Sequence, residues 1–125
     1  MFNTPPVFAV YASLLTMRWI EEQGGVESIG KKNIIKSEYL YNEIDRNPLF
    51  TGFAAKKDRS EMNATFNMAN KSHSESFDTI CESAGISGLK GHRSVGGYRA
   101  SIYNALPKES VDILVDCMQN LEQKI

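Results

Sequence analysis

The chain has 125 residues, of which 42% are hydrophobic, which is the size and composition of one compact domain. Its 14 basic and 15 acidic residues give a net charge of -1, which excludes an overall field that would attract nucleic acid or an anionic membrane. No apolar run approaches the roughly 20 residues that span a bilayer, and no signal-peptide pattern is seen, so a soluble cytoplasmic protein is expected.

Two long helices are predicted first. Apolar residues recur at helical spacing over Pro5–Gln23, and the pair Gly24-Gly25 stops this helix. A second helix is predicted over Val26–Arg46, where Asn47-Pro48 ends it. The apolar positions of the first helix are Phe8, Tyr11, Ala12, Leu15 and Trp19, and the stripe of the second is Val26, Ile29, Asn33, Ser37, Leu40, Tyr41 and Ile44.

A strand hairpin is predicted next. Apolar and polar residues alternate over Met62–Met68, which is typical of a strand with one face on a core. Leu49–Ala55 is the predicted partner strand, and Lys56–Ser60 connects the two. The run Lys56–Arg59 within this connection is expected to be a solvated hairpin end, with a pairing of Arg59 with Asp58 or Glu61 as the alternative.

Helices and strands then alternate. Ser74–Ala84 is a predicted helix with Gly85 as its stop, and two short strands, Gly88–Arg93 and Tyr98–Asn104, are predicted after it. The last predicted helix is Pro107–Lys124, with Val111, Leu114, Val115, Met118 and Leu121 inward. The order indicates an α+β domain (an α/β sandwich), in which helices cover one face of a small, largely antiparallel sheet and a long N-terminal helix precedes it.

The two cysteines are expected to be buried free thiols. Cys81 and Cys117 fall inside predicted helices, and they have no metal-ligand spacing. Two cysteines in a chain of this length do not indicate a disulfide framework.

The stretch Gly91–Ser101 carries the densest signal for chemistry. It holds two arginines, Arg93 and Arg99, and one histidine, His92, among three glycines. An arginine binds a carboxylate or phosphate through its planar fork, and glycines let backbone N–H groups approach an anion. A solvated turn with surface arginines is the alternative, because a glycine pair near basic residues is a weak motif. The glycine spacings that would indicate a dinucleotide or nucleoside triphosphate are absent.

A second candidate anion site precedes the first helix. Asn3-Thr4-Pro5-Pro6 leads into a helix whose free N–H groups could receive a phosphate, although an ordinary cap is the alternative. His73 lies in a polar run and is expected to be solvated. No cluster of metal ligands and no Ser/His/Asp arrangement is seen.

Taken together, these segments resemble the phosphoserine aminotransferase family, class V members of the fold-type I pyridoxal-phosphate enzymes. The resemblance covers nearly the whole chain. It is carried by Asn3-Thr4-Pro5-Pro6-Val7-Phe8, Trp19, Gly24-Gly25, Asp58-Arg59-Ser60, Met62-Asn63, Gly85-Ile86, the run from Gly88 to Gly97 and the run from Arg99 to Asn104.

The resemblance implies an enzyme that interconverts 3-phosphohydroxypyruvate plus glutamate and O-phosphoserine plus 2-oxoglutarate, in serine biosynthesis. Arg99 would hold the substrate α-carboxylate, and His92 and Arg93 would bind the phosphate or the second carboxylate. Asn3 and Thr4 would reach across a homodimer to the phosphate of pyridoxal 5'-phosphate in the neighbouring subunit. No catalytic residue and no metal ligand is expected in this chain.

The resemblance also implies a division of the chain. Residues 1–23 would be the end of a large domain with its connecting helix, and residues 24–125 the C-terminal small domain. In the family the Schiff-base lysine lies upstream of Asn3, and no lysine here matches it. The chain alone is therefore expected neither to bind the cofactor nor to transaminate. The segment Ala69–Ser76 matches no pattern of the family.

Three other functions stay open. One is another class V enzyme, such as a cysteine desulfurase or an alanine-glyoxylate type transaminase. The desulfurase is disfavoured, because it needs a cysteine in a mobile loop and neither Cys81 nor Cys117 provides one. A module that binds an anionic metabolite would use the loop from His92 to Arg99. An interaction domain would use the apolar face of the first helix.

Overall fold

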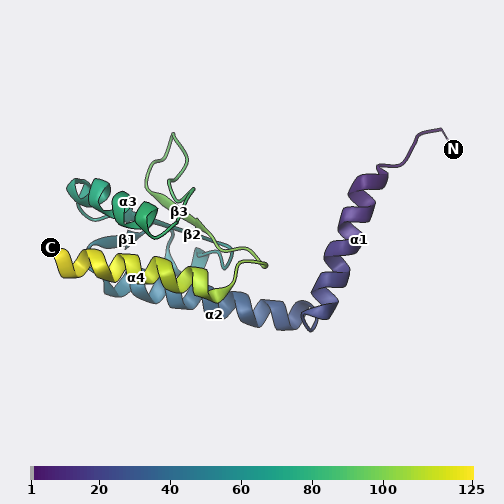
Figure 1. Ribbon diagram of the computed structural model, residues 1–125, viewed down its shortest axis with the longest axis horizontal. Helices are drawn as coiled ribbons and strands as arrows, with labels where there is room; N and C mark the ends of the chain where they lie inside the picture. Colours follow the sequence, from purple (N-terminus) through teal and green to yellow (C-terminus); the bar gives the residue numbers. More distant parts are fainter. Residues whose placement is uncertain (1) are drawn as a thin grey trace. The chain divides into compact units, whose positions relative to one another are not determined.

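A computed structural model describes residues 2–125 and confirms the α+β class. The chain divides into two compact units, one ending at Lys32 and the other spanning Asn33–Ile125. The division expected after residue 23 stays a prediction. The elements labelled in Figure 1 are the helices α1 (Val7–Glu22), α2 (Gly25–Arg46), α3 (Ser74–Ser83) and α4 (Lys108–Lys124) and the strands β1 (Phe50–Gly52), β2 (Asn63–Met68) and β3 (Tyr98–Ser101). Two short 3-10 helices, η1 (Lys56–Asp58) and η2 (Lys71–His73), lie between them.

The first unit contains α1, none of whose side chains is buried. Its exposed apolar residues include Phe8 at 85% and Tyr11 at 56%. They occupy several sides of the helix, a pattern that is typical of a helix covered on all sides. Gly24 and Gly25 have φ values of 91° and 82°, so the pair ends α1 as predicted, and α2 begins at Gly25, one residue before the predicted Val26.

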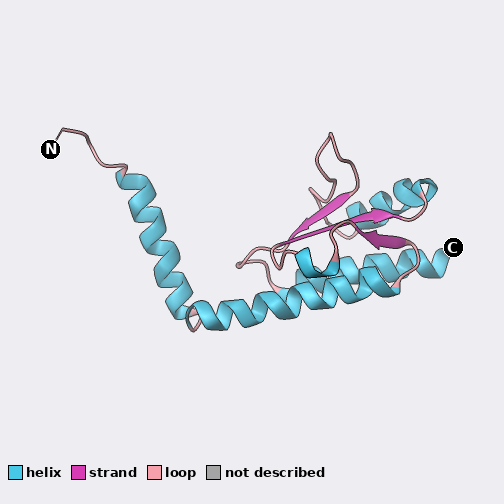
Figure 2. Ribbon diagram, turned by 180° about the vertical axis from the view of Figure 1, so that it is seen from behind, coloured by secondary structure: helices cyan, strands magenta, loops and turns pink. Residues whose placement is uncertain are grey.

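The second unit contains an antiparallel sheet in the order β1-β2-β3 (Figure 2). The predicted hairpin is confirmed, but β1 is shorter than Leu49–Ala55. The predicted strand over Gly88–Arg93 is wrong, because only Lys90 bridges Tyr98 before the chain turns back on itself.

One face of the sheet packs on a core shared with α2, α3 and α4. The inward residues of β2 are Ala64, Phe66 and Met68, as its alternation predicts. The other face is polar, and there Thr65 pairs with Arg99 across β2 and β3. The core consists of Leu40, Tyr41, Ile44, Phe50, Ala64, Phe66, Met68, Phe77, Cys81, Tyr98, Ala100, Ile102, Val111, Leu114, Val115, Cys117, Met118 and Leu121.

The two cysteines lie where the sequence predicts, whereas one apolar residue of α2 does not. The free thiols of Cys81 and Cys117 are buried as expected, and burial raises the pKa of Cys81 to about 12. Val26, predicted to belong to the inward stripe of α2, is instead 77% exposed. It stands at the first turn of α2, where the helix has only just begun.

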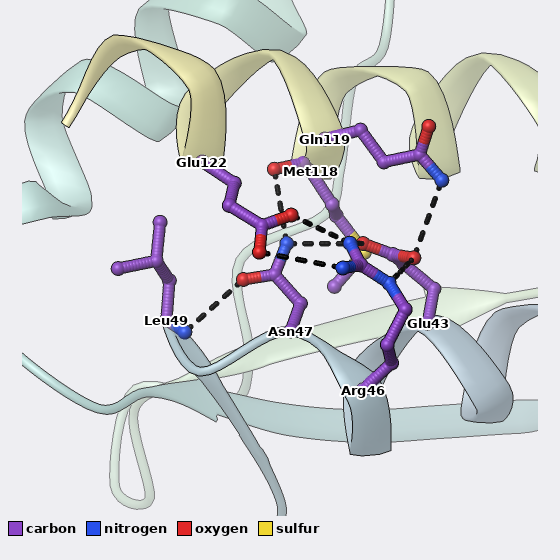
Figure 3. Close-up of polar contacts among 7 residues, drawn as sticks. All are labelled: Glu43, Arg46, Asn47, Leu49, Met118, Gln119 and Glu122. Atoms are coloured by element: carbon purple, nitrogen blue, oxygen red, sulfur yellow. Dashed lines mark hydrogen bonds and ion pairs between the residues drawn. The ribbon is translucent and has the colours of Figure 1, made fainter.

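A polar network that is buried at Glu43 and Asn47 and exposed at Arg46 joins the end of α2 to α4 (Figure 3). Glu43 is 5% exposed and accepts hydrogen bonds from Arg46 at 2.9 and 2.8 Å and from Asn47 at 3.0 Å. Burial alone would raise the pKa of Glu43, but these hydrogen bonds hold it below its ordinary value. Asn47 also donates to the carbonyl of Met118 at 3.2 Å, and Arg46 pairs with Glu122 at 2.6 Å. The network therefore fixes α4 against α2 under the sheet.

Arg59 does not pair with Asp58 or Glu61. Its guanidinium donates to both carboxylate oxygens of Asp45 in α2, at 3.0 and 2.6 Å, and lies 4.6 Å from the ring centroid of Tyr41. These hydrogen bonds lower the pKa of Asp45 to about 2. The connection between β1 and β2 is thus tied to α2, a partner that local sequence could not indicate.

Candidate functional site

The loop between Lys90 and Tyr98 is closed at its base and carries His92 and Arg93. Lys90 and Tyr98 form an isolated bridge, and the N–H of Gly91 donates to the carbonyl of Gly97 at 2.8 Å. Within the loop, the carbonyl of His92 accepts two backbone hydrogen bonds, at 3.0 and 2.8 Å, from the turn that follows. The backbone around His92 therefore has a defined conformation.

Gly97 allows this loop to pack tightly against β2. Its φ of 67° lies in the left-handed region, and a Cβ there would meet the side chain of Asn67 and, at 2.9 Å, the carbonyl of Phe66. Gly91 has a similar constraint, because a Cβ there would meet the carbonyl of Gly96. Gly91 and Gly97 thus allow close packing of backbone on backbone, a role separate from the approach to an anion that was predicted for the loop glycines.

The imidazole of His92 is exposed and held by its neighbour in the turn. Its Nδ1 lies 2.7 Å from the hydroxyl of Ser94, and the Ser94 N–H donates to the same nitrogen at 3.3 Å. The other ring nitrogen, Nε2, has no partner among residues 2–125. Nε2 is therefore available to a ligand.

Arg99 stands in the middle of β3 on the polar face of the sheet. Its backbone N–H donates to the carbonyl of Leu89 at 2.7 Å, which holds the strand edge against the loop. The side chain is exposed, and none of the ion pairs found among residues 2–125 uses Arg99 or Arg93. Both guanidinium groups can bind an added anion.

Two hollows adjoin the loop, and His92 lines both. One, of about 220 Å³, is also lined by Arg99 and by Phe53. The other, of about 450 Å³, is also lined by Arg93 and by Lys71. The structure thus brings His92 together with each predicted arginine, but the two arginines line different hollows.

Lys71 is a candidate anion-binding residue that the sequence analysis did not find. It lies in η2, where Asn70 caps the turn by accepting a hydrogen bond from the Ser72 N–H at 3.0 Å. The cap predicts a turn at this place. Nothing in the local sequence predicts that the turn adjoins the His92 loop, because that proximity depends on how β2 and β3 pair.

Asn3 and Thr4 belong to the first unit and are exposed just before α1. No side chain caps α1 at Pro6, and no acidic residue lies in its first turn. The free N–H groups there can receive an anion, and the amide and hydroxyl of the two residues are suitable further donors. The chemistry of this donor set fits a phosphate group.

Residues 2–125 contain neither a helix suited to crossing a membrane nor a cluster of metal ligands. No helix there combines the length and the apolar character that a bilayer crossing requires. No three side chains among His, Cys, Asp and Glu in this part of the chain gather as a metal site.

Comparison with known proteins shows a family match over most of the chain. The model of the class-V aminotransferases matches residues 1–114. A curated relative, phosphoserine aminotransferase of Flavobacterium johnsoniae, is 61% identical over 125 residues, which is 100% of this chain and 35% of the relative. The chain therefore spans about a third of that relative's length.

Solved structures show the same similarity. Phosphoserine aminotransferase from Bacillus circulans subsp. alkalophilus has a TM-score of 0.90 and 42% identity, covering 98% of this chain and 34% of that one. The pyridoxal-phosphate-bound phosphoserine aminotransferase from Trichomonas vaginalis has a TM-score of 0.84 and 40% identity, covering 95% of this chain and 34% of that one.

Proposed function

Because the chain belongs to the class-V aminotransferase family, as its sequence predicts, we propose that it forms part of a phosphoserine aminotransferase. Such an enzyme interconverts 3-phosphohydroxypyruvate plus glutamate and O-phosphoserine plus 2-oxoglutarate, in serine biosynthesis. The observation that carries this proposal is the 61% sequence identity, over the whole of this chain, to the phosphoserine aminotransferase of Flavobacterium johnsoniae.

In this proposal Arg99 holds the α-carboxylate that the substrates share. Its position on β3 supports this role, because the paired strand fixes the backbone and the polar face of the sheet leaves the guanidinium free of internal carboxylates. A planar guanidinium binds a carboxylate through two parallel hydrogen bonds, which fixes the orientation as well as the position of the substrate.

His92 and Arg93 bind the distal anion, which is the phosphate of phosphoserine or the second carboxylate of glutamate. His92 lines the hollow of Arg99 and that of Arg93, which supports a role for it at either proposed anion position. Lys71 adds a positive charge to the second hollow and would favour the dianionic phosphate.

The cofactor in this proposal is pyridoxal phosphate, which supplies the electron sink for amino-group transfer when bound. Asn3 and Thr4 hold its phosphate, with the N-terminus of α1 adding backbone donors. That they act on the cofactor of a neighbouring subunit in a homodimer, and that the enzyme works in the cytoplasm, stay predictions. So does the inactivity of the 125-residue chain alone.

The test is turnover by the full-length protein that contains this chain, supplied with pyridoxal phosphate, phosphoserine and 2-oxoglutarate. Glutamate formation that requires phosphoserine is the expected result. Binding of phosphoserine without any glutamate formation would contradict the proposal and favour the anion-binding module.

A further inference from the structure

Ser94 makes two contacts to one nitrogen of His92. The Ser94 hydroxyl oxygen lies 2.7 Å from His92 Nδ1, and the Ser94 backbone N–H donates to this nitrogen at 3.3 Å. A backbone N–H can only donate, so Nδ1 must be the acceptor and carry no proton. A neutral imidazole whose Nδ1 accepts has its proton on Nε2.

We propose that Ser94 is a positioning residue that holds His92 in the Nε2–H tautomer, so that His92 donates from Nε2 to an anionic oxygen of the substrate. The inference rests on the proposed function and deepens it, because it assigns the atom of His92 that meets the substrate and the residue that orients it.

The surroundings of the ring support this role. The carbonyl of His92 is fixed by two N–H groups of the turn, so the main remaining freedom is rotation of the side chain. The two contacts from Ser94 restrict that rotation. Since the ring lines both hollows, its free Nε2–H is a donor available to a ligand in either of them. A donor aligned before the substrate arrives loses less entropy on binding.

The tautomer can be measured in the chain itself, without cofactor or turnover. The chain has 2 histidines, so His73→Gln leaves His92 as the single imidazole. Long-range proton–nitrogen correlation spectra of this variant should show a proton on Nε2 and none on Nδ1. Ser94→Ala keeps the backbone N–H contact but removes the closer hydroxyl contact to Nδ1, so it should raise the share of the Nδ1–H tautomer, while Ser94→Thr keeps both contacts and should not. A proton on Nδ1 in the parent, or a ratio unchanged in Ser94→Ala, would overturn the inference.

Kinetics of the full-length protein give a second, independent readout. His92→Gln places an amide N–H near the position of Nε2, whereas His92→Asn places it near Nδ1. The Asn variant should raise the KM for phosphoserine about tenfold, and the Gln variant by less than about threefold. Ser94→Ala should raise this KM about fivefold at nearly unchanged kcat, and Ser94→Thr should preserve it.

Equal increases in the KM for phosphoserine in His92→Gln and His92→Asn, or an unchanged KM in Ser94→Ala, would contradict the positioning role. If the full-length protein does not turn over phosphoserine at all, the proposed function fails, and the tautomer spectra still decide the role of Ser94.

Discussion

The carboxylate of Asp78 in α3 accepts a hydrogen bond from the phenol of Tyr98 at 3.0 Å. Tyr98 begins β3, where the His92 loop ends, and burial together with Asp78 raises its pKa to about 12. The other oxygen of Asp78 pairs with Lys90, where the loop starts, at 3.0 Å. One carboxylate outside the loop therefore connects both of its ends.

Replacing Asp78 should weaken substrate binding, although Asp78 itself is not proposed to contact the substrate. Asp78→Ala leaves both ends of the loop without their shared acceptor, so we expect the KM for phosphoserine to rise about fivefold, the equivalent of one ordinary hydrogen bond. Steady-state kinetics of the full-length protein measure this. Glu82→Ala, one turn later on α3 and exposed, is the control. Equal effects of the two variants would contradict the bracing role.

Replacing Arg99 tests the carboxylate clamp. Arg99→Lys keeps the charge but loses the planar fork, so kcat/KM should fall about tenfold, and Arg99→Ala should lower it about 100-fold. Both glutamate and phosphoserine should be affected, because both carry the α-carboxylate. Lys57→Ala in η1 is the control for removal of an exposed charge. Kinetics unchanged in Arg99→Ala would rule the clamp out.

Alanine substitutions at the adjacent Gly96 and Gly97 distinguish the cost of backbone strain from the cost of a steric clash. Gly96→Ala meets open space at a φ of 75° and should destabilise by about 1 kcal/mol, from backbone strain alone. Gly97→Ala has similar strain and also meets the Phe66 carbonyl, so it should cost at least about 2 kcal/mol. Denaturant unfolding of the chain measures both. Equal costs would mean that the loop does not pack on β2 as described.

The ion pair of Asp45 and Arg59 predicts a particular acid sensitivity. The pKa of Asp45 falls from 3.8 to about 2 in the folded chain, so its contribution is present above pH 3.8 and is lost as the pH falls through about 2. Asp45→Asn should lower the free energy of unfolding by about 1 kcal/mol at neutral pH, after allowance for solvent screening.

The difference in free energy of unfolding between the parent and Asp45→Asn should shrink as the pH falls from 3.8 to about 2. Asp58→Asn, an exposed carboxylate in η1, should show no comparable difference at any pH. A stability difference for Asp45→Asn that is constant across the acid range would contradict the pairing.

Lys36 is expected to stabilise the fold, although it is a charged residue. It is 3% exposed, and its Nζ donates to three carbonyls after β3, those of Ile102, Tyr103 and Leu106, at 3.3, 2.8 and 3.0 Å. Lys36→Met removes their donor and should destabilise the chain by about 2 kcal/mol. Lys124→Met, exposed near the C-terminus, is the control. A denaturation midpoint unchanged in Lys36→Met would contradict this role.

The local signals in the sequence predicted most elements correctly. Gly85 ends α3, Pro107 precedes α4, and the alternation in β2 assigns its buried face. The predicted strand over Gly88–Arg93 failed because Gly91 must lie against the backbone of Gly97, a contact that strand propensity does not describe. Boundaries set by glycine and proline were thus predictable, whereas pairing set by tertiary contact was not.

The same distinction holds for the candidate site. His92, Arg93 and Arg99 stand out by residue type within one short stretch, so composition alone singled them out. Their distribution over two hollows depends on how η2 and β2 pack beside the loop, and so does the place of Lys71. The sequence therefore named candidate anion-binding residues, whose roles stay predictions, but it could not give their arrangement over the two hollows.

The most direct test of the central claim is the preference of the full-length protein for phosphoserine over serine, measured as a ratio of kcat/KM values in the parent and in Arg93→Ala. If this chain supplies the distal anion site, the parent should strongly prefer phosphoserine, and Arg93→Ala should lower the ratio about tenfold or more, because a charge-assisted contact to the phosphate is lost. A parent without this preference, or a ratio unchanged in Arg93→Ala, would contradict the account.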